Sequence, residues 1–264
     1  MELSYHDFRG FVEQAKKVSE WRLIEGADWD TEIGALVEST AELVPQPPML
    51  IFDRVKGYPP GFRVISLPYA AYKRVAVALG LPLEMSKLEL LRLAARRIGS
   101  AKPIPPKFVQ DSPLFENVMK GDNVNLLKFP ALRFHENDGG RYFGPGGGLI
   151  NADPETGFVN TGTYRMQLHD RNLLGLWMSP GQNGRQICMK YWQQGKSCPV
   201  VATYGQHPLV FMPSYTKHPY GCSEIEISGG LMGRPLEVLK GTDDRPADTG
   251  KLRDRDRRGS TSPV

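Results

Sequence analysis

The chain has 264 residues, of which 40% are hydrophobic, and its net charge at pH 7 is only +4. This length can bury a core and form one or two domains, and so balanced a charge gives no support for nucleic-acid binding. No apolar run approaches the roughly 20 residues of a membrane helix, and the N-terminus does not resemble a signal peptide.

The first hundred residues predict a mixed region of helices and strands. Ser4 and Asp7 can form a capping box before an amphipathic segment, and Ser86 and Glu89 can form a second one. A glycine- and proline-rich turn at 57–61 separates two apolar runs and indicates a hairpin. The expected elements are helices over 4–19, 31–43 and 86–99 and strands over 49–55 and 62–67.

The proline-rich segment 101–106 ends this region and is the predicted domain boundary. Beyond it, short apolar runs alternate with glycine-rich turns, a pattern typical of a β-rich domain built on a small barrel. The strands expected there cover 148–152, 158–167, 173–178 and 200–203. The fold class is therefore α+β, with a mixed region over 1–106 and a cofactor domain over 107–241.

The sequence Asn160-Thr-Gly-Thr-Tyr-Arg165 and the later Ser223-Glu224 are the most informative chemical features. They offer an amide oxygen, a guanidinium and a carboxylate, which suit a hard metal ion and a phosphate. The period of two in a strand places Arg165 on a polar face, opposite Tyr164. The plainer alternatives are that Asn160 caps a turn, that Arg165 is solvated, and that Glu224 forms a surface ion pair.

Three other patterns carry less weight. Glycines at 144–148 lead into a strand-like run instead of a helix, so a turn is favoured over a dinucleotide-binding loop. The histidines show no metal-ligand spacing, although His135 lies in a motif described below and is worth testing. The three cysteines lack C-x-x-C spacing, which is typical of a reduced, cytoplasmic protein.

Several ordered motifs give the chain its family resemblance. They are the segments 134–143 (FHENDGGRYF), 153–157 (DPETG), 160–165 (NTGTYR), 179–187 (SPGQNGRQI), 221–230 (GCSEIEISGG) and 233–240 (GRPLEVLK). Together they resemble the UbiD family of decarboxylases, which use prenylated FMN. The resemblance implies a split β-barrel cofactor domain related to flavin reductases, and a reversible decarboxylase of an aromatic or α,β-unsaturated carboxylic acid.

The resemblance also assigns roles to residues of this sequence. Asn160 and Glu224 match the family's ligands for Mn²⁺ or Mg²⁺, with K⁺ a further candidate ion. The ion holds the flavin phosphate. Asn183 stands where the family commonly has a third, histidine ligand. Arg165 matches the arginine of a Glu-Arg-Glu catalytic network that contacts the cofactor and the substrate carboxylate. The residues expected at the cofactor are Thr163, Tyr164, Arg165 and Gln182.

The resemblance stops at Lys240, and the polar segment 242–264 is expected to be disordered. Residues 254–259 (DRDRRG) can be written in codons that, read one base later, spell Ile-Glu-Ile-Glu-Gly, as in the family's next motif. We interpret the segment as the product of a frameshift or truncation. The loss of two network glutamates predicts impaired turnover, and the loss of a packed domain predicts exposed apolar surface and poor solubility.

The expected partners are a carboxylic acid substrate, a flavin prenyltransferase that supplies the cofactor, and further copies of the chain in the intact form. Two other functions stay open from sequence. The chain could be a non-catalytic flavin- or metal-binding subunit of a multi-chain carboxylase, or a flavin reductase on the same barrel. Co-purification with a related chain would indicate the first, and NAD(P)H oxidation with ordinary FMN the second.

Overall fold

A computed structural model describes residues 3–144 and 146–241. Its helices are α1 (Phe8–Val18), α2 (Glu32–Leu43), α3 (Tyr72–Leu79), α4 (Lys87–Gly99), α5 (Asn183–Gln193), α6 (Pro208–Tyr215) and α7 (Glu224–Met232). Its strands are β1 (Trp21–Glu25), β2 (Met49–Asp53), β3 (Val64–Ser66), β4 (Lys107–Phe108), β5 (Arg141–Phe143), β6 (Gly147–Ala152), β7 (Val159–Gly162), β8 (Arg165–Asp170), β9 (Leu173–Trp177), β10 (Val201–Tyr204) and β11 (Glu237–Val238). Three short 3₁₀ helices lie between residues 113 and 128. The predicted tail and its proposed frameshift lie outside the described residues.

The capping chemistry fixes where the first and fourth helices begin. Ser86 and Glu89 form the predicted capping box, and α4 ends at Gly99 as expected. The capping box expected between Ser4 and Asp7 is wrong. Asp7 is itself the N-cap of α1, and its carboxylate accepts the Gly10 N–H at 2.6 Å, so the helix begins at Phe8.

The N-terminal sheet contains one strand that was not predicted. Strand β1 runs parallel to β2, which pairs antiparallel with β3 as the hairpin prediction required. Most side chains of β1 are exposed, so the strand has no alternation of apolar and polar residues to reveal it. In contrast, every residue of β2 is buried, which explains its clear apolar signal.

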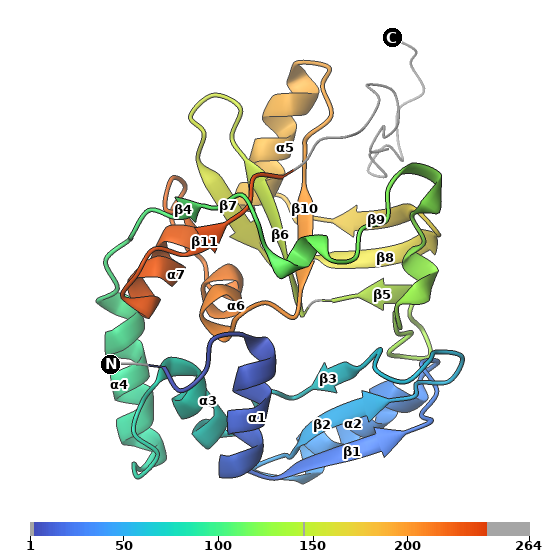
Figure 1. Cartoon of the computed structure of the whole chain (residues 1–264), viewed down its shortest axis with the longest axis vertical. Coiled ribbons are helices and arrows are strands. Elements are labelled where there is room, and N and C mark those ends of the chain that lie inside the picture. Colours follow the sequence, from blue (N-terminus) through green and yellow to red (C-terminus); the bar gives the residue numbers. More distant parts are fainter. Residues whose placement is uncertain (1–2, 145, 242–264) are drawn as a thin grey trace.

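The second half of the chain forms two further three-stranded sheets, ordered β10-β6-β7 and β5-β8-β9 (Figure 1). The single strand expected over 158–167 is wrong, because β7 and β8 belong to different sheets. Strands β4 and β11 add a small parallel pair. The described strands form no closed barrel, so the fold is a mixed α/β arrangement in which the chain crosses between sheets at residues 163–164.

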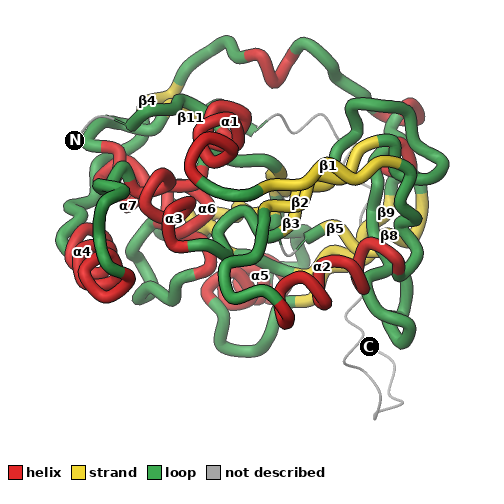
Figure 2. The backbone as a smooth tube through the Cα atoms, turned by 90° about the horizontal axis from the view of Figure 1, so that it is seen from below, coloured by secondary structure: helices red, strands yellow, loops and turns green. Residues whose placement is uncertain are grey.

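One hydrophobic core joins segments that are distant in sequence. Phe11 of α1 and Ala76 of α3 belong to the same buried cluster as Leu209 of α6 and Ile227 of α7. Figure 2 shows these four helices gathered at one end of the molecule. A second cluster, which includes Met166, packs α5 onto the sheets of the second half. Helices α6 and α7 therefore pack on the N-terminal segment, on the other side of the predicted boundary. No helix among the described residues is long and apolar enough to cross a membrane.

Candidate functional site

The crossing between the two sheets is shaped by the Tyr164 side chain, which is buried. A Cβ atom added to Gly162 would lie 2.6 Å from the Tyr164 hydroxyl, and one added to Gly184 would lie 2.5 Å from it. Both distances are far below van der Waals contact. Glycine is therefore required at these two positions so that the ring can lie between β7 and the first turn of α5.

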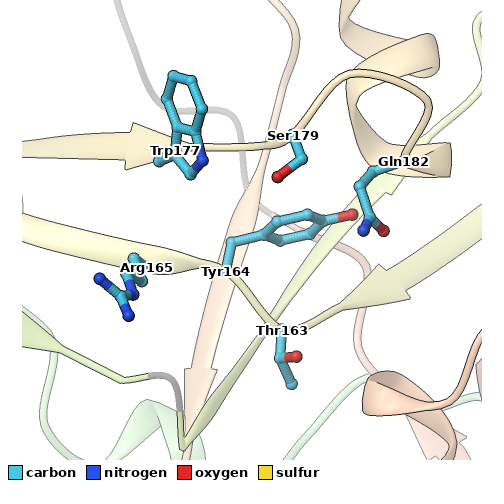
Figure 3. A pocket seen from close by; sticks show the side chains of 6 residues that line it. All are labelled: Thr163, Tyr164, Arg165, Trp177, Ser179 and Gln182. Atoms are coloured by element: carbon cyan, nitrogen blue, oxygen red, sulfur yellow. The ribbon is translucent and has the colours of Figure 1, made fainter.

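A pocket of about 300 Å³ opens beside this ring (Figure 3). Its lining residues are Thr163, Tyr164, Arg165, Trp177, Ser179 and Gln182. We call it the larger pocket. Arg165 and Trp177 are opposite one another in the β8–β9 ladder, which brings the guanidinium and the indole to one wall. The larger pocket thus contains all four residues that the sequence predicted at the cofactor.

A tight turn places the residues at the start of α5. The Gln182 N–H donates to the Ser179 carbonyl at 3.3 Å, and Gly181 has a φ of +81°. Proline followed by a glycine of positive φ is the pattern of a type II turn. Gln182 is the N-cap of α5 and Asn183 is its first residue, and this helix was not predicted from the sequence.

A second, smaller pocket of about 40 Å³ adjoins the first and shares Tyr164 and Gln182 with it. Asn160 from β7, Asn183 from α5 and Glu224 from α7 all line this smaller pocket. A cavity of this size can hold a water molecule or an ion. The three residues predicted as metal ligands therefore come together, although they are far apart in the sequence.

Hydrogen bonds fix the orientation of the Asn160 amide. Its Nδ2 donates to Asn151 Oδ1 at 3.2 Å, and Asn151 Nδ2 donates in turn to the Gly184 carbonyl at 2.9 Å. All three groups are buried. Because Nδ2 is the atom used on Asn151, Oδ1 is the Asn160 atom left to accept, either from the neighbouring Tyr164 side chain or from a ligand in the smaller pocket.

Glu224 is a buried carboxylate, with only 4% of its surface exposed. Its Oε2 accepts the Thr161 N–H at 2.8 Å, but no described lysine or arginine pairs with it, including Lys217 in the same pocket. Burial raises the pKa of the Glu224 carboxyl, and the Thr161 N–H partly opposes that shift. A buried carboxylate is costly unless a cation neutralises it. Glu226, the other acidic residue of this turn, lines neither pocket.

Two buried polar atoms of the smaller pocket have no hydrogen-bond partner among the described residues. They are Thr161 Oγ1 and His218 Nε2. His218 has no metal-ligand spacing to another histidine, so its place in the sequence does not indicate a role. Within residues 3–144 and 146–241, no group of three or more His, Cys, Asp or Glu could hold a metal ion. A metal here would have to use amide oxygens, and the unpaired Glu224, the Asn160 oxygen and these orphaned atoms fit one.

Other sequence candidates lie elsewhere. His135 contacts Glu38 and Asp138 in an exposed cluster and lines neither pocket, and its hydrogen bond to Glu38 raises its pKa. The glycine-rich segment 144–148 leads into β6 and not into a helix. It is therefore not a dinucleotide-binding loop, which would have to begin a helix. A Cβ atom on Gly147 would lie 2.6 Å from the Tyr204 ring, which explains one of these glycines by packing.

Residues 107–248 match the family described as 3-octaprenyl-4-hydroxybenzoate carboxy-lyase Rift-related domain, and residues 20–98 match the N-terminal domain of the same carboxy-lyase. The chain belongs to the UbiD family of carboxy-lyases. The resemblance inferred from the sequence motifs is thereby confirmed.

Individual relatives agree with this assignment. A pyrrole-2-carboxylic acid decarboxylase of Pseudomonas aeruginosa is 30% identical over 248 residues, which cover 91% of this chain and 49% of that protein. The closed form of Sedimentibacter hydroxybenzoicus vanillic acid decarboxylase is 28% identical, with a TM-score of 0.82, over 90% of this chain and 51% of that chain.

A third relative is an evolved dimeric UbiD-class enzyme from Pelotomaculum thermopropionicum, whose structure was solved in complex with prFMN. It is 26% identical, with a TM-score of 0.76, over 90% of this chain and 53% of that chain. This chain therefore spans about half the length of the curated relatives it matches.

Proposed function

We propose that this chain carries the metal and prenylated-FMN sites of a reversible decarboxylase that acts on an aromatic or α,β-unsaturated carboxylic acid. The observation that carries the proposal is the convergence of Asn160, Asn183 and Glu224 in a pocket that adjoins the one lined by Arg165. The family assignment supplies the class of reaction.

The smaller pocket suits a divalent cation together with a phosphate. Asn160, Asn183 and Glu224 would hold Mn²⁺ or Mg²⁺, and K⁺ is a further candidate ion beside it. Lys217 lines the same pocket, and helix α5 begins there, so a lysine ammonium and the positive end of a helix dipole lie beside this pocket. These groups would bind the phosphate of the flavin mononucleotide next to the metal.

The larger pocket suits the flavin ring and an acidic substrate. Arg165 is exposed and has no hydrogen bond or ion pair to a described residue, so its guanidinium is free to bind a carboxylate in a bidentate manner. Trp177 beside it is 53% exposed and offers a flat face for an aromatic ring. When bound, prenylated FMN would supply the electron sink for loss of CO₂, and Arg165 would orient the carboxylate.

One observation favours a second candidate function. No carboxylate among the described residues lines the larger pocket, so the group that transfers the proton in the family is not beside Arg165. The chain would then be a flavin- and metal-binding subunit of a multi-chain carboxylase, completed by carboxylates from a partner. Exposed apolar residues such as Phe108 (68%) and Leu114 (76%) agree with a surface that another polypeptide covers.

Further features of the proposal follow from the family resemblance. They are the split-barrel description of the second half, the division at residue 106, supply of the cofactor by a flavin prenyltransferase, a homo-oligomer, and a cytoplasmic location. The neighbour solved with prFMN supports the flavin. We propose these features together with the activity, and co-purification and size-exclusion experiments would test the partners.

The test is to co-express the chain with a flavin prenyltransferase and to measure its absorbance spectrum and metal content. We expect a bound modified flavin and one Mn²⁺ or Mg²⁺ per chain. Both should be lost in Asn160→Ala and Glu224→Gln and retained in the matched control Glu226→Gln. A purified chain without colour or metal, or one whose metal content is unchanged in both site variants, would contradict the proposal.

A further inference from the structure

The smaller pocket contains an imidazole that neither the family motifs nor the sequence spacing assign. His218 lines this pocket beside Asn160, Asn183 and Glu224. Its Nε2 atom is buried and has no hydrogen-bond partner among the described residues. A buried polar nitrogen without a partner is costly, so it indicates a ligand that the protein chain itself does not supply.

The segment that carries His218 is held firmly in place. Asn183 Nδ2 donates to the His218 carbonyl at 3.3 Å, which joins the segment to the start of α5. Two residues further on, the Tyr220 hydroxyl hydrogen-bonds to Asp153, and Asp153 also pairs with Lys190 at 2.7 Å. These contacts fix the backbone at His218 and two residues after it. Because its Nε2 is also buried and it lines the smaller pocket, His218 is not a free surface histidine.

The hydrogen bond between Asn183 and His218 determines which atom of the Asn183 amide is available to a ligand. Once Asn183 uses its Nδ2 on the His218 carbonyl, its Oδ1 is the atom left for a ligand. The position where the resemblance places an imidazole thus supplies an amide oxygen, and the residue bonded to it brings an imidazole into the same pocket. The pocket keeps one nitrogen donor, which now comes from a different part of the chain.

We propose that His218 Nε2 ligates the divalent cation of the smaller pocket and makes the site prefer Mn²⁺ to Mg²⁺. The inference rests on the proposed function in one respect, that a metal binds between Asn160 and Glu224. Imidazole nitrogen is a poor ligand for Mg²⁺, which prefers oxygen, whereas first-row transition ions accept it readily. An oxygen-only site would show a smaller preference.

The experiment uses the purified chain, labelled with ¹⁵N-histidine or unlabelled, and titrated with Mn²⁺ alone. Electron spin echo envelope modulation detects nitrogen bound to Mn²⁺, and the label identifies that nitrogen as histidine. We expect an imidazole signal in the wild type and in the control His169→Gln, and its loss in His218→Gln. The Mn²⁺ affinity of His218→Gln should fall by about tenfold or more, while its Mg²⁺ affinity changes less. Circular dichroism checks that the variants are folded.

The outcomes separate the inference from the proposed function. A wild-type chain that binds Mn²⁺ without a histidine signal, or a signal that persists in His218→Gln, overturns the role of His218 and leaves the metal site standing. A wild-type chain that binds neither Mn²⁺ nor Mg²⁺ overturns the metal site itself. If His218→Gln is unfolded, the labelled wild-type spectrum together with His169→Gln still decides the question, because His135, His207 and His6 lie outside both pockets.

Discussion

Replacing Glu224 by glutamine should separate the cost of a buried charge from the benefit of a bound cation. The wild-type carboxylate is 4% exposed and has no cationic partner among the described residues. Glutamine can still accept the Thr161 N–H, which is 2.8 Å from Oε2 in the wild type. Without metal, the free energy of unfolding of Glu224→Gln should therefore equal that of the wild type or exceed it by up to about 2 kcal/mol.

Addition of Mn²⁺ should reverse this order. A ligand that binds only the folded state at 100 times its dissociation constant stabilises by about 2.7 kcal/mol, which for a chain of this size raises the melting temperature by roughly 5–10 °C. Glu224→Gln should gain less than about 0.5 kcal/mol under the same conditions, because the charge that binds the ion is gone.

The assay is thermal and urea unfolding of wild type, Glu224→Gln and the control Glu226→Gln, each with EDTA and with Mn²⁺. Glu226→Gln should behave as the wild type, since Glu226 lines neither pocket. Two results would refute the reasoning. One is a loss of more than about 2 kcal/mol in metal-free Glu224→Gln, which would mean that the carboxylate already has a cationic partner. The other is equal stabilisation of both proteins by Mn²⁺.

Three further predictions concern other parts of the site and its support. Gly184→Ala should lower the free energy of unfolding by about 1–3 kcal/mol in urea titrations, because the new Cβ would lie 2.5 Å from the Tyr164 hydroxyl; a gain in stability would contradict this packing. Burial lowers the pKa of His207 to about 4, and its Nδ1 accepts the Leu209 N–H. The stability that this histidine contributes is therefore complete above pH 6.5 and should fall by roughly 3 kcal/mol towards pH 4, as measured by urea unfolding, whereas His207→Asn should show no such loss. Arg165→Ala should abolish binding of an aromatic carboxylate in calorimetry and leave Mn²⁺ affinity unchanged, because Arg165 lines only the larger pocket; weaker Mn²⁺ binding would show that the pockets are coupled.

The sequence predicted local features whose causes are themselves local. The capping box at Ser86 and the buried strand β2 depend on residues a few positions apart, and the structure contains both. Strand β1 was missed because its side chains are mostly exposed and give no periodic signal. The break between β7 and β8 was missed because it depends on the Tyr164 ring packing against Gly184, a contact with a distant part of the chain.

The candidate site also combines residues that the sequence predicted with one that only the folded chain reveals. Family resemblance predicted Asn160, Asn183 and Glu224 as one group. Spacing alone could not have done so, because the three residues come from β7, α5 and α7, which are distant in the sequence. His218 could not be predicted in this way, because only the folded chain shows its Nε2 buried without a partner. The Ser223-Glu224 motif favoured Glu224 over Glu226, and the structure places Glu224 in the smaller pocket and Glu226 outside both pockets.

The hydrophobic core shared by α1, α3, α6 and α7 also limits where related chains could recombine and still fold. Helix α7 brings Glu224 to the smaller pocket, and Ile227 and Leu231 of the same helix belong to one buried cluster with Phe11 of the N-terminal segment. A chimaera that combined residues 1–106 of one relative with the remainder of another would therefore have to rebuild the packing of the helix that carries Glu224. Recombination within this family should succeed more often at surface loops than at the proline-rich segment 101–106, even though that segment resembles a linker.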